Sequence, residues 1–177
     1  GVEVAITNDA NAAAIGEGVF GNAKGMKDYV VITLGTGLGS GIVSNGEMIY
    51  GHDGFAGEYG HIAVDSRLTG RECGCGRKGC LEAYASATGI KRTAFELMAK
   101  MNCESELRDI PFSKFEAVML STAADKGDPI AKEAFRFTGE VLGKALADLM
   151  ATTSPEAIIL FGGLAKAGKH IFEPTQW

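Results

Sequence analysis

The amino-acid sequence predicts an α/β fold in which a mixed β-sheet is flanked by helices. Short apolar and β-branched runs are separated by glycine-rich turns, and a long segment with apolar residues at spacings of three and four follows them. Apolar residues make up 46% of the 177, which is typical of a compact globular chain with room for one core or two small lobes. Glycine is unusually frequent, at 25 residues, and clusters where backbone can approach a ligand.

The strands are expected mainly in the first third of the chain. The β-branched run Val2–Ile6 ends before Asp9, so a strand would deliver that residue to the start of a helix over Ala10–Gly18. Asn45-Gly46 is a strong hairpin signal. Together with this turn, three runs predict an antiparallel meander: Tyr29–Leu34, Gly41–Val43 and Glu47–Tyr50.

Helices dominate the second half. Residues 51–80 read as a long loop in which only His61–Val64 is strand-like, and the helices that follow are expected over Glu82–Met101 and Phe115–Lys126. Asp128-Pro129 predicts an N-cap and first turn for a helix reaching about Ala151. Its apolar face, which should pack on the sheet, is Ile130, Ala134, Phe137, Val141, Ala145 and Leu149. A buried strand over Ala157–Phe161 then ends in two glycines before a new helix.

Charge and hydropathy exclude some classes of protein. The net charge is −5 and no block of lysine and arginine stands out, which argues against a nucleic-acid surface in this segment. No apolar run reaches the roughly 18 residues that a membrane span needs, so a cytoplasmic protein is expected. The chain starts at Gly1 rather than at methionine, which suggests a processed or truncated product.

The cysteine cluster is the strongest chemical signal. Cys73, Cys75 and Cys80 fall within eight residues, and His61 lies twelve residues upstream of the first of them. Cys₃His is a standard tetrahedral zinc set, and with four protein ligands the metal would be structural. A disulfide is the alternative, which a reducing compartment and the Cys-x-Cys spacing disfavour. Cys103, far from this cluster, is expected to be an ordinary buried or partly buried thiol.

Other signals each allow two interpretations. The run 35–41, Gly-Thr-Gly-Leu-Gly-Ser-Gly, lacks the lysine of a P-loop but could bind phosphate through its backbone N–H groups. A simple hairpin turn is an equally good interpretation of the same residues. Gly162-Gly163 is equally compatible with a nearby nucleotide or with simple turn chemistry. Asp9 could act as a general base or as a helix cap. Glu58 and Glu82 could bind a polyhydroxylated ligand or be ordinary surface residues.

Taken together, the motifs resemble those of the ROK family (repressor, open reading frame, kinase). The resemblance covers nearly the whole chain and rests on five stretches in the family's order: Thr7-Asn-Asp-Ala-Asn-Ala12, Leu34-Gly-Thr-Gly-Leu-Gly39, Glu58-Tyr-Gly-His61, Cys73-Gly-Cys-Gly-Arg-Lys-Gly-Cys-Leu-Glu82 and Phe161-Gly-Gly163. It implies that residues 1–177 form the second, ribonuclease H-like lobe of a glucokinase-like enzyme of the actin and hexokinase superfamily, with a zinc loop at about 61–82.

The resemblance also implies roles for individual residues. Asp9 would be the catalytic base that takes the proton from a hexose hydroxyl, normally O6, as that oxygen attacks the γ-phosphate of Mg-ATP. His61 would hold zinc with one ring nitrogen and face the sugar with the other. Sugar contacts would come from Asn8, Asp9, Gly54, Glu58, His61 and Glu82, and nucleotide contacts from Gly35, Thr36, Gly37, Gly39, Gly162 and Gly163.

The resemblance has limits that bear on activity. Family members begin with a domain carrying an Asp-x-Gly-Gly-Thr phosphate loop and continue past the Gly-Gly motif, and nothing in this chain matches those parts. We therefore expect residues 1–177 alone to be a poor or inactive kinase, although the family implies a dimer or tetramer active in carbohydrate metabolism and glycolysis. Two alternatives remain: a sugar-responsive ROK repressor, whose helix-turn-helix would lie upstream, and a zinc-stabilised interaction domain without catalysis. The hexose is not fixed by these residues.

Overall fold

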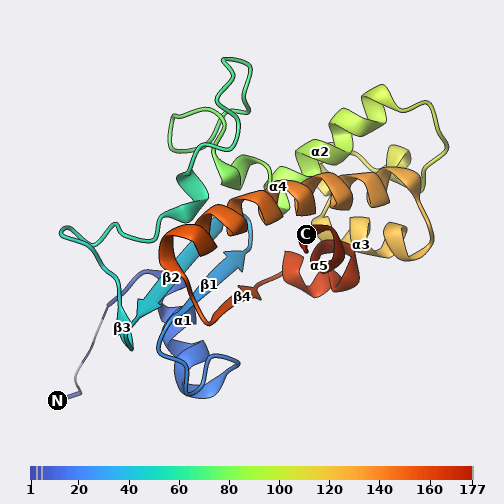
Figure 1. Ribbon diagram of the computed structural model, residues 1–177. Helices are drawn as coiled ribbons and strands as arrows, with labels where there is room; N and C mark the ends of the chain where they lie inside the picture. The colour runs from blue at the N-terminus through green and yellow to red at the C-terminus, as the bar shows by residue number, and fades with distance from the viewer. Residues whose placement is uncertain (3, 5, 177) are drawn as a thin grey trace.

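The computed structural model describes residues 1–2, 4 and 6–176, and its centre is a four-stranded mixed sheet (Figure 1). The strands are β1 (Tyr29–Leu34), β2 (Leu38–Ser44), β3 (Glu47–Met48) and β4 (Ala157–Phe161), in the order β3-β2-β1-β4. The first three pair antiparallel, and β4 pairs parallel with β1. The expected mixed sheet and meander are therefore confirmed.

Alternate residues of β1 face two different cores. Val30, Ile32 and Leu34 belong to the main cluster, which also contains Leu142 and Leu149 from the long helix. Tyr29 and Val31 belong to a smaller cluster on the other face, with Ala14 of the first helix. Because side chains alternate along a strand, one continuous apolar run can cover both faces of the sheet. Helices flank the sheet on both sides, as expected.

The hairpin between β2 and β3 follows its sequence signal. Asn45 and Gly46 have φ angles of 52° and 80°, the left-handed conformation that a tight hairpin turn requires. Strand β3 pairs with β2 through two residue pairs, Val43 with Met48 and Ser44 with Glu47, and the pairing ends at Met48. The expected strand over Glu47–Tyr50 is thus two residues too long.

Helix α1 (Asp9–Phe20) lies against β2, and a glycine allows the close approach. A Cβ atom built at Gly41 would lie 2.6 Å from Ala14 Cβ and 2.9 Å from the carbonyl oxygen of Ala10. Both neighbours belong to α1, whose first residue is Asp9. The glycine of β2 therefore sets the distance between the sheet and the helix that carries the candidate base.

We expect Gly41→Ala to destabilise the fold by about 1–3 kcal/mol, the usual cost of overpacking a well-filled contact. The matched control is Gly16→Ala in α1, where the added methyl group meets nothing within 4 Å and replaces a mid-helix glycine. That control should stabilise the fold by about 0.5–1 kcal/mol. Urea denaturation of both variants measures the difference, and equal stabilities would refute the close packing of α1 on β2.

The helical layer contains α2 (Ala87–Lys100), α3 (Ala117–Asp125), α4 (Pro129–Thr153) and α5 (Lys169–Thr175). Helix α2 starts five residues later than expected, because Ser86 is its N-cap and residues Leu81–Ala83 form a separate 3₁₀ turn. Short 3₁₀ turns also cover Glu106–Asp109, Phe112–Lys114 and Leu164–Ala167. The last of these is the new helix start expected after the two glycines, and α5 follows it.

Helix α4 is the longest element and confirms its predicted start. The Asp128 carboxylate accepts hydrogen bonds from the backbone N–H groups of Ile130 and Ala131, both at 2.9 Å, with Pro129 in the first turn. The helix packs along α5 and α2, and Leu142, Ala145 and Leu149 join the core over the sheet. Phe137 and Val141, assigned to the same face by their spacing, are only half-buried.

Two predicted strands are wrong, those over Val2–Ile6 and His61–Val64. A third, β4, forms where expected but is less buried than expected. Val2, Val4 and Ile6 are in no strand and are 83–95% exposed, since they pair with no neighbouring strand among the described residues; residues 3 and 5 lie outside the described part. In the second, His61 is the last residue of a 3₁₀ turn (Tyr59–His61), and Ala63 forms a single bridge with Cys80. Strand β4 is half-buried because it pairs on one side only in the described chain.

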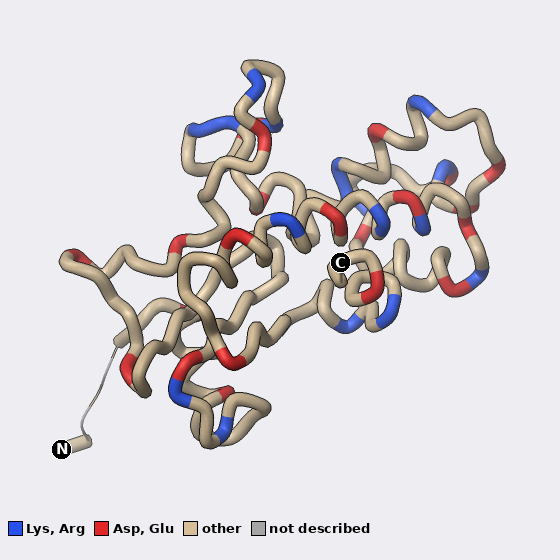
Figure 2. The backbone as a smooth tube through the Cα atoms, in the orientation of Figure 1, with Lys and Arg blue, Asp and Glu red and all other residues tan. Residues whose placement is uncertain are grey.

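Charged residues of both signs are interspersed along the chain (Figure 2). On α4, Arg136 bonds to Glu133 and Glu140 within its own helix, and Lys126 after α3 bonds to Glu106 at 2.9 Å. Among the described residues, no helix is both long and apolar enough to cross a membrane. These surface pairs contribute little to stability, typically below about 1 kcal/mol each.

Candidate active site and metal centre

Most of the predicted site residues line one pocket of about 510 Å³. Five segments meet there: the start of α1, the glycine turn between β1 and β2, the two segments that flank the cysteine loop, and the end of β4. The residues of the predicted site that line it are Asn8, Asp9, Gly35, Thr36, Gly37, Gly39, Glu58, His61, Glu82 and Gly162. The pocket lies where β1 and β4 end and β2 begins, and the neighbouring segments supply polar groups to it.

Asp9 is the first residue of α1, and it is not the N-cap. Asn8 takes that role: its side-chain oxygen accepts from the backbone N–H of Ala10 at 2.7 Å and of Asn11 at 3.3 Å. Asp9 adds one bond, from Ala10 N–H to its own Oδ1 at 2.8 Å, and Oδ2 has no hydrogen bond to any residue that the structure describes. Asp9 is therefore an exposed side chain at the start of α1 that lines the pocket.

The glycine turn is shaped by contacts within the protein. A Cβ atom at Gly37 would lie 2.2 Å from Glu82 Oε2, and one at Gly39 would lie 2.8 Å from Thr33 Oγ1. Gly35 has nothing within 4 Å of its Cβ position, so its open side faces the pocket. A side chain at Gly37 would therefore displace the Glu82 carboxylate, one at Gly39 would crowd Thr33, and Gly35 has open space beside it.

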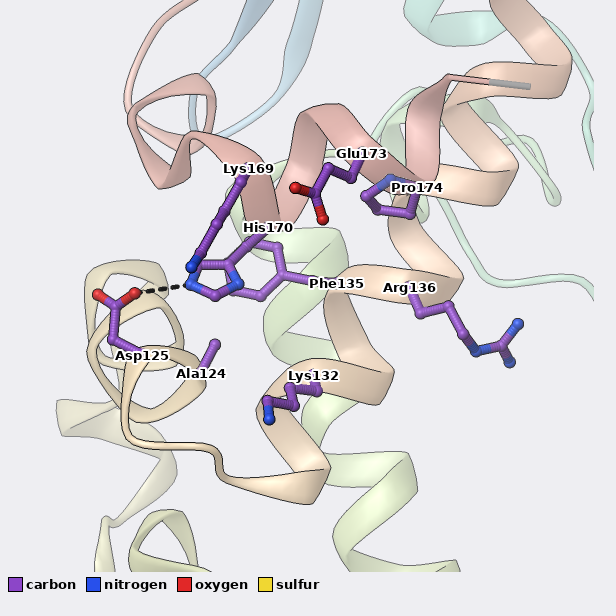
Figure 3. Close-up of a pocket in the computed structure, with 9 residues that line it drawn as sticks. All are labelled: Ala124, Asp125, Lys132, Phe135, Arg136, Lys169, His170, Glu173 and Pro174. Carbon is purple, nitrogen blue, oxygen red and sulfur yellow. Dashed lines mark hydrogen bonds and ion pairs between the residues drawn. The ribbon is translucent and has the colours of Figure 1, made fainter.

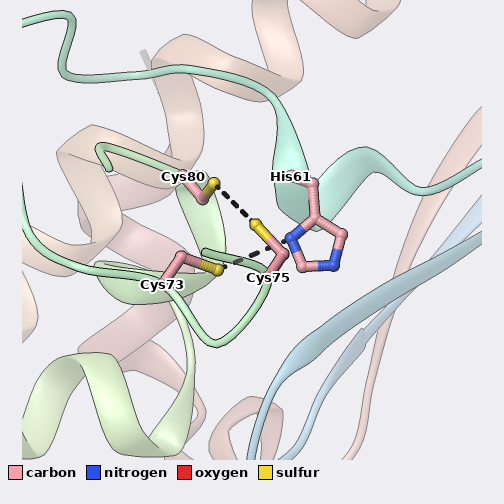
Figure 4. Close-up of side chains that lie close together, drawn as sticks. All are labelled: His61, Cys73, Cys75 and Cys80. Atoms are coloured by element: carbon pink, nitrogen blue, oxygen red, sulfur yellow. Dashed lines mark hydrogen bonds between the residues drawn. The ribbon is translucent and has the colours of Figure 1, made fainter. Parts of the chain in front are cut away.

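His61, Cys73, Cys75 and Cys80 converge as the sequence predicts (Figure 4). Their ligand atoms lie within 4.8 Å of one another; Cys73 Sγ is 3.6 Å from His61 Nδ1, and Cys75 Sγ is 3.7 Å from Cys80 Sγ. Zinc bound tetrahedrally, with about 2.3 Å to sulfur and about 2.0 Å to nitrogen, separates its ligands by roughly 3.5–3.8 Å. The donor set and these two spacings fit a tetrahedral ion.

The thiols do not share one environment. Burial raises the pKa of Cys80 to about 12, and burial likewise raises the pKa of Cys73. A hydrogen bond from the Arg77 backbone N–H lowers the pKa of Cys75, the most exposed of the three. Low-dielectric surroundings disfavour an isolated thiolate, whereas a bound divalent cation reverses that preference. Thiols arranged in this way are suited to a cation that stabilises all three thiolates.

The two ring nitrogens of His61 point to different neighbours. Nδ1 lies by Cys73, whereas Nε2 lies 3.9 Å from Glu58 Oε2, on the side of the pocket. Glu82 bridges the same two regions, since its Oε1 lies 3.7 Å from Cys73 Sγ and its Oε2 accepts from Leu38 N–H at 3.0 Å. The cysteine cluster and the pocket therefore share side chains.

The cysteine loop is anchored by a buried arginine that sequence reasoning missed. The guanidinium of Arg71 donates to the carbonyls of Ala83 and Gly89 at 3.1 and 3.2 Å, and it pairs with Glu96 at 2.8 Å. Its backbone N–H donates to Tyr84 Oη, which donates to Asp65. These hydrogen bonds join the entry and exit of the loop. An arginine two residues before the first cysteine was the only signal in the sequence.

A hydrogen-bonded ion pair from Arg67, together with the hydroxyl of Tyr84, holds the pKa of the Asp65 carboxyl well below its usual range. The carboxylate thus stays ionised at the mouth of the loop, at neutral and mildly acidic pH. Arg67 lies within the loop and Tyr84 just after it. Their bonds to Asp65 therefore help to fix the path of the chain from residue 65 to residue 84.

Gly54 and Gly163, two further predicted contacts, are not among the residues lining the pocket. Gly54 is exposed, with φ at 88°, in the loop before Glu58. Cys103 is half-buried against the main core and lies apart from the other three cysteines, as expected. A separate hollow of about 550 Å³ between α3, α4 and α5 contains His170, which bonds to Asp125 at 2.8 Å, and includes none of the predicted site residues (Figure 3).

Comparison with known proteins agrees with this arrangement. The ROK family model matches residues 1–175. A glucokinase of Halalkalibacterium halodurans is 42% identical over 176 residues, which is 98% of this chain and 52% of that protein. The crystal structure of a ROK family glucokinase from Streptomyces griseus, in complex with glucose and AMPPNP, superposes with a TM-score of 0.86 at 39% identity, covering 96% of this chain and 55% of that one.

A regulator is also similar: the DNA-binding transcriptional dual regulator NagC of Escherichia coli is 32% identical over 164 residues, 93% of this chain and 39% of that protein. The fold is thus the ROK sugar-kinase fold. The chain belongs to the ROK family. It spans about half the length of the curated glucokinases it matches.

Proposed function

We propose that this chain is the sugar-binding and metal-binding half of an ATP-dependent hexose kinase. The substrate would be a glucose-type hexose phosphorylated at O6. The observation that supports this most strongly is the single pocket in which the carboxylate of Asp9 lies among hydroxyl-binding side chains and the glycine turn. The similarity to glucokinases, one of them solved with glucose and an ATP analogue, favours the same substrates.

The proposed reaction assigns one task to each part of the pocket. Asn8, Glu58, His61 and Glu82 would bind and orient the sugar hydroxyls. Asp9 Oδ2, which has no hydrogen-bond partner in the described part of the chain, would take the proton from O6–H as that oxygen attacks the γ-phosphorus. The new O6–P bond forms, the bond to the β-phosphate oxygen breaks, and ADP leaves. Backbone N–H groups of the glycine turn would face the phosphates.

Two ions belong to this proposal. Magnesium, bound with ATP, would neutralise charge that develops on the phosphates. Zinc would be held by His61, Cys73, Cys75 and Cys80, a closed set of four protein ligands, and would therefore be structural. The protein's own contribution is to fix His61 so that Nε2 is directed towards the pocket while Nδ1 belongs to the metal centre.

The nucleotide contacts and the surroundings of the enzyme follow from the same proposal. Gly35, Thr36, Gly37, Gly39 and Gly162 line the pocket on the phosphate side, and Gly163 follows at the end of β4. Gly54 would reach the sugar through the loop before Glu58. We place the enzyme in the cytoplasm, as a homodimer or homotetramer, with a role in carbohydrate metabolism and glycolysis.

A sugar-responsive repressor is the second candidate, because NagC is similar over 93% of this chain. A repressor needs the sugar contacts but not a general base or a phosphate-binding turn. The presence of Asp9 at the pocket and of Gly35 facing it favours the kinase. A helix-turn-helix upstream of residue 1 in the whole protein would favour the repressor.

The discriminating experiment measures ADP release by the whole protein with ATP, magnesium and a panel of hexoses: glucose, mannose, fructose and N-acetylated hexosamines. ADP release that depends on a hexose supports the kinase and shows which sugar is used. Sugar binding by calorimetry without ADP release at any hexose would instead support the repressor and refute the kinase.

A further inference from the structure

The segment that follows the cysteine loop holds the glycine turn in place. Three hydrogen bonds cross between them: Leu38 N–H donates to Glu82 Oε2 at 3.0 Å, Ala87 N–H donates to the Gly35 carbonyl at 2.9 Å, and Thr88 Oγ1 donates to the Thr36 carbonyl at 2.9 Å. The partners are 44 to 52 residues apart in sequence. The turn is therefore fixed from outside rather than by its own sequence alone.

The turn depends on such contacts because it has few of its own. Its internal bond runs from Gly35 N–H to the Gly37 carbonyl at 3.0 Å. Glycine has more backbone freedom to lose on ordering than any other residue, and two of the four residues from 35 to 38 are glycine. A turn that must present its N–H groups to phosphate oxygens in one geometry gains from being ordered before the ligand arrives.

The hydrogen bond to the Thr36 carbonyl is the one that the Thr88 hydroxyl makes among the described residues. Thr88 is the second residue of α2, whose N-cap is Ser86, and the Ser86 hydroxyl already accepts the Gly89 N–H at 3.0 Å. Thr88 is exposed and does not line the pocket, whereas Thr36, whose carbonyl it binds, does. Its hydroxyl is therefore directed at the turn rather than at helix capping or at the site itself.

Glu82 extends the connection to the sugar side. One carboxylate oxygen accepts the Leu38 N–H, and the other lies by Cys73 and the pocket. Glu82 is itself a proposed sugar contact, so its replacement would change both subsites at once. Thr88, which lies outside the pocket, is the residue that isolates the support of the turn.

We propose that Thr88 is a positioning residue for the nucleotide, acting through the Thr36 carbonyl. This rests on the proposed kinase function. Thr88 touches neither sugar nor nucleotide in this account. Its loss should therefore weaken ATP use without changing the sugar subsite.

The test compares Thr88→Val, Thr88→Ser and the unmodified whole enzyme. Valine keeps the shape and loses the hydroxyl, so we expect the KM for ATP to rise about three- to tenfold, the effect of one net hydrogen bond. The KM for the sugar at saturating ATP and kcat should stay within about twofold. Serine should restore the KM for ATP. Thr152→Val, which removes a hydroxyl bonded to a carbonyl of α4, is the matched control and should change neither.

A second readout does not depend on turnover. Amide hydrogen exchange at Gly35–Leu38 should be faster in Thr88→Val and normal in Thr88→Ser. An active enzyme whose Thr88→Val variant keeps its KM for ATP and its exchange rates would overturn the inference. So would an equal rise in both KM values that serine does not reverse. Absence of hexose-dependent ADP release in the unmodified enzyme would refute the proposed function itself, and exchange at the turn would then decide the positioning claim.

Discussion

Replacing Asp9 by asparagine is expected to lower kcat for hexose phosphorylation by about 10²–10⁴-fold, the usual contribution of a general base. Asparagine keeps the size and the hydrogen-bond acceptor for the Ala10 N–H but cannot take a proton. Helix capping should survive, because Asn8 is the N-cap. Steady-state kinetics of the whole enzyme with calorimetric titration of the sugar separates the two effects, and the sugar Kd should stay within about threefold.

The matched control for this prediction is Asp109→Asn, an exposed aspartate in a 3₁₀ turn away from the pocket. It should leave kcat unchanged. If Asp9→Asn retained more than about a tenth of kcat, Asp9 would not be the base. If instead the variant lost sugar affinity and unfolded at lower temperature, Asp9 would be a structural residue of the helix start.

The second large effect concerns the metal centre. We expect one zinc per chain, and we expect Cys80→Ser to weaken zinc binding by more than about 100-fold, since even residues outside the ligand shell typically change affinity by about 10–100-fold. Cys80 is fully buried beside Cys75, and its replacement removes one of four convergent donors. Elemental analysis of freshly reduced protein, followed by chelator competition, measures the stoichiometry and the affinity.

Cys103→Ser provides the matched control, because that thiol lies apart from the cluster and should leave one zinc per chain. Chelation of the unmodified protein adds an independent measurement: it should lower the unfolding temperature, since zinc bound only by the folded chain stabilises it. Unmodified protein that holds no zinc, or a Cys80→Ser variant that keeps it, would contradict the Cys₃His assignment.

Local sequence signals predicted the parts of the fold that local chemistry determines. Asp128-Pro129 and Asn45-Gly46 each satisfy their own backbone through a cap or a turn, and both occur where expected. The strand over residues 2–6 fails for the opposite reason. A strand needs a partner that its own sequence cannot specify, and the described residues of this run have none. The start of α2 was also predicted too early, because Leu81–Ala83 forms a separate 3₁₀ turn and Ser86 is the N-cap of the helix.

The candidate site was predictable as a set of residues but not as a network. Spacing identified the three cysteines with His61 upstream, and the strand-to-helix junction identified Asp9 as a base or a cap. The family resemblance then chose between the alternative roles. The contacts that join the segments come from tertiary packing: Arg71 on the carbonyls of Ala83 and Gly89, and Glu82 on the N–H of Leu38. An isolated arginine or glutamate has no periodicity or spacing that would reveal such a role.

The most direct test of the account is the identity of the product. The whole enzyme is incubated with ATP, magnesium and the hexose that supports ADP release, and the products are quantified by ³¹P and ¹³C NMR. We predict hexose 6-phosphate and ADP in equal amounts, both lost in Asp9→Asn. ADP without sugar phosphate, or phosphate on a hydroxyl other than O6, would contradict a hexose bound with its O6 beside Asp9.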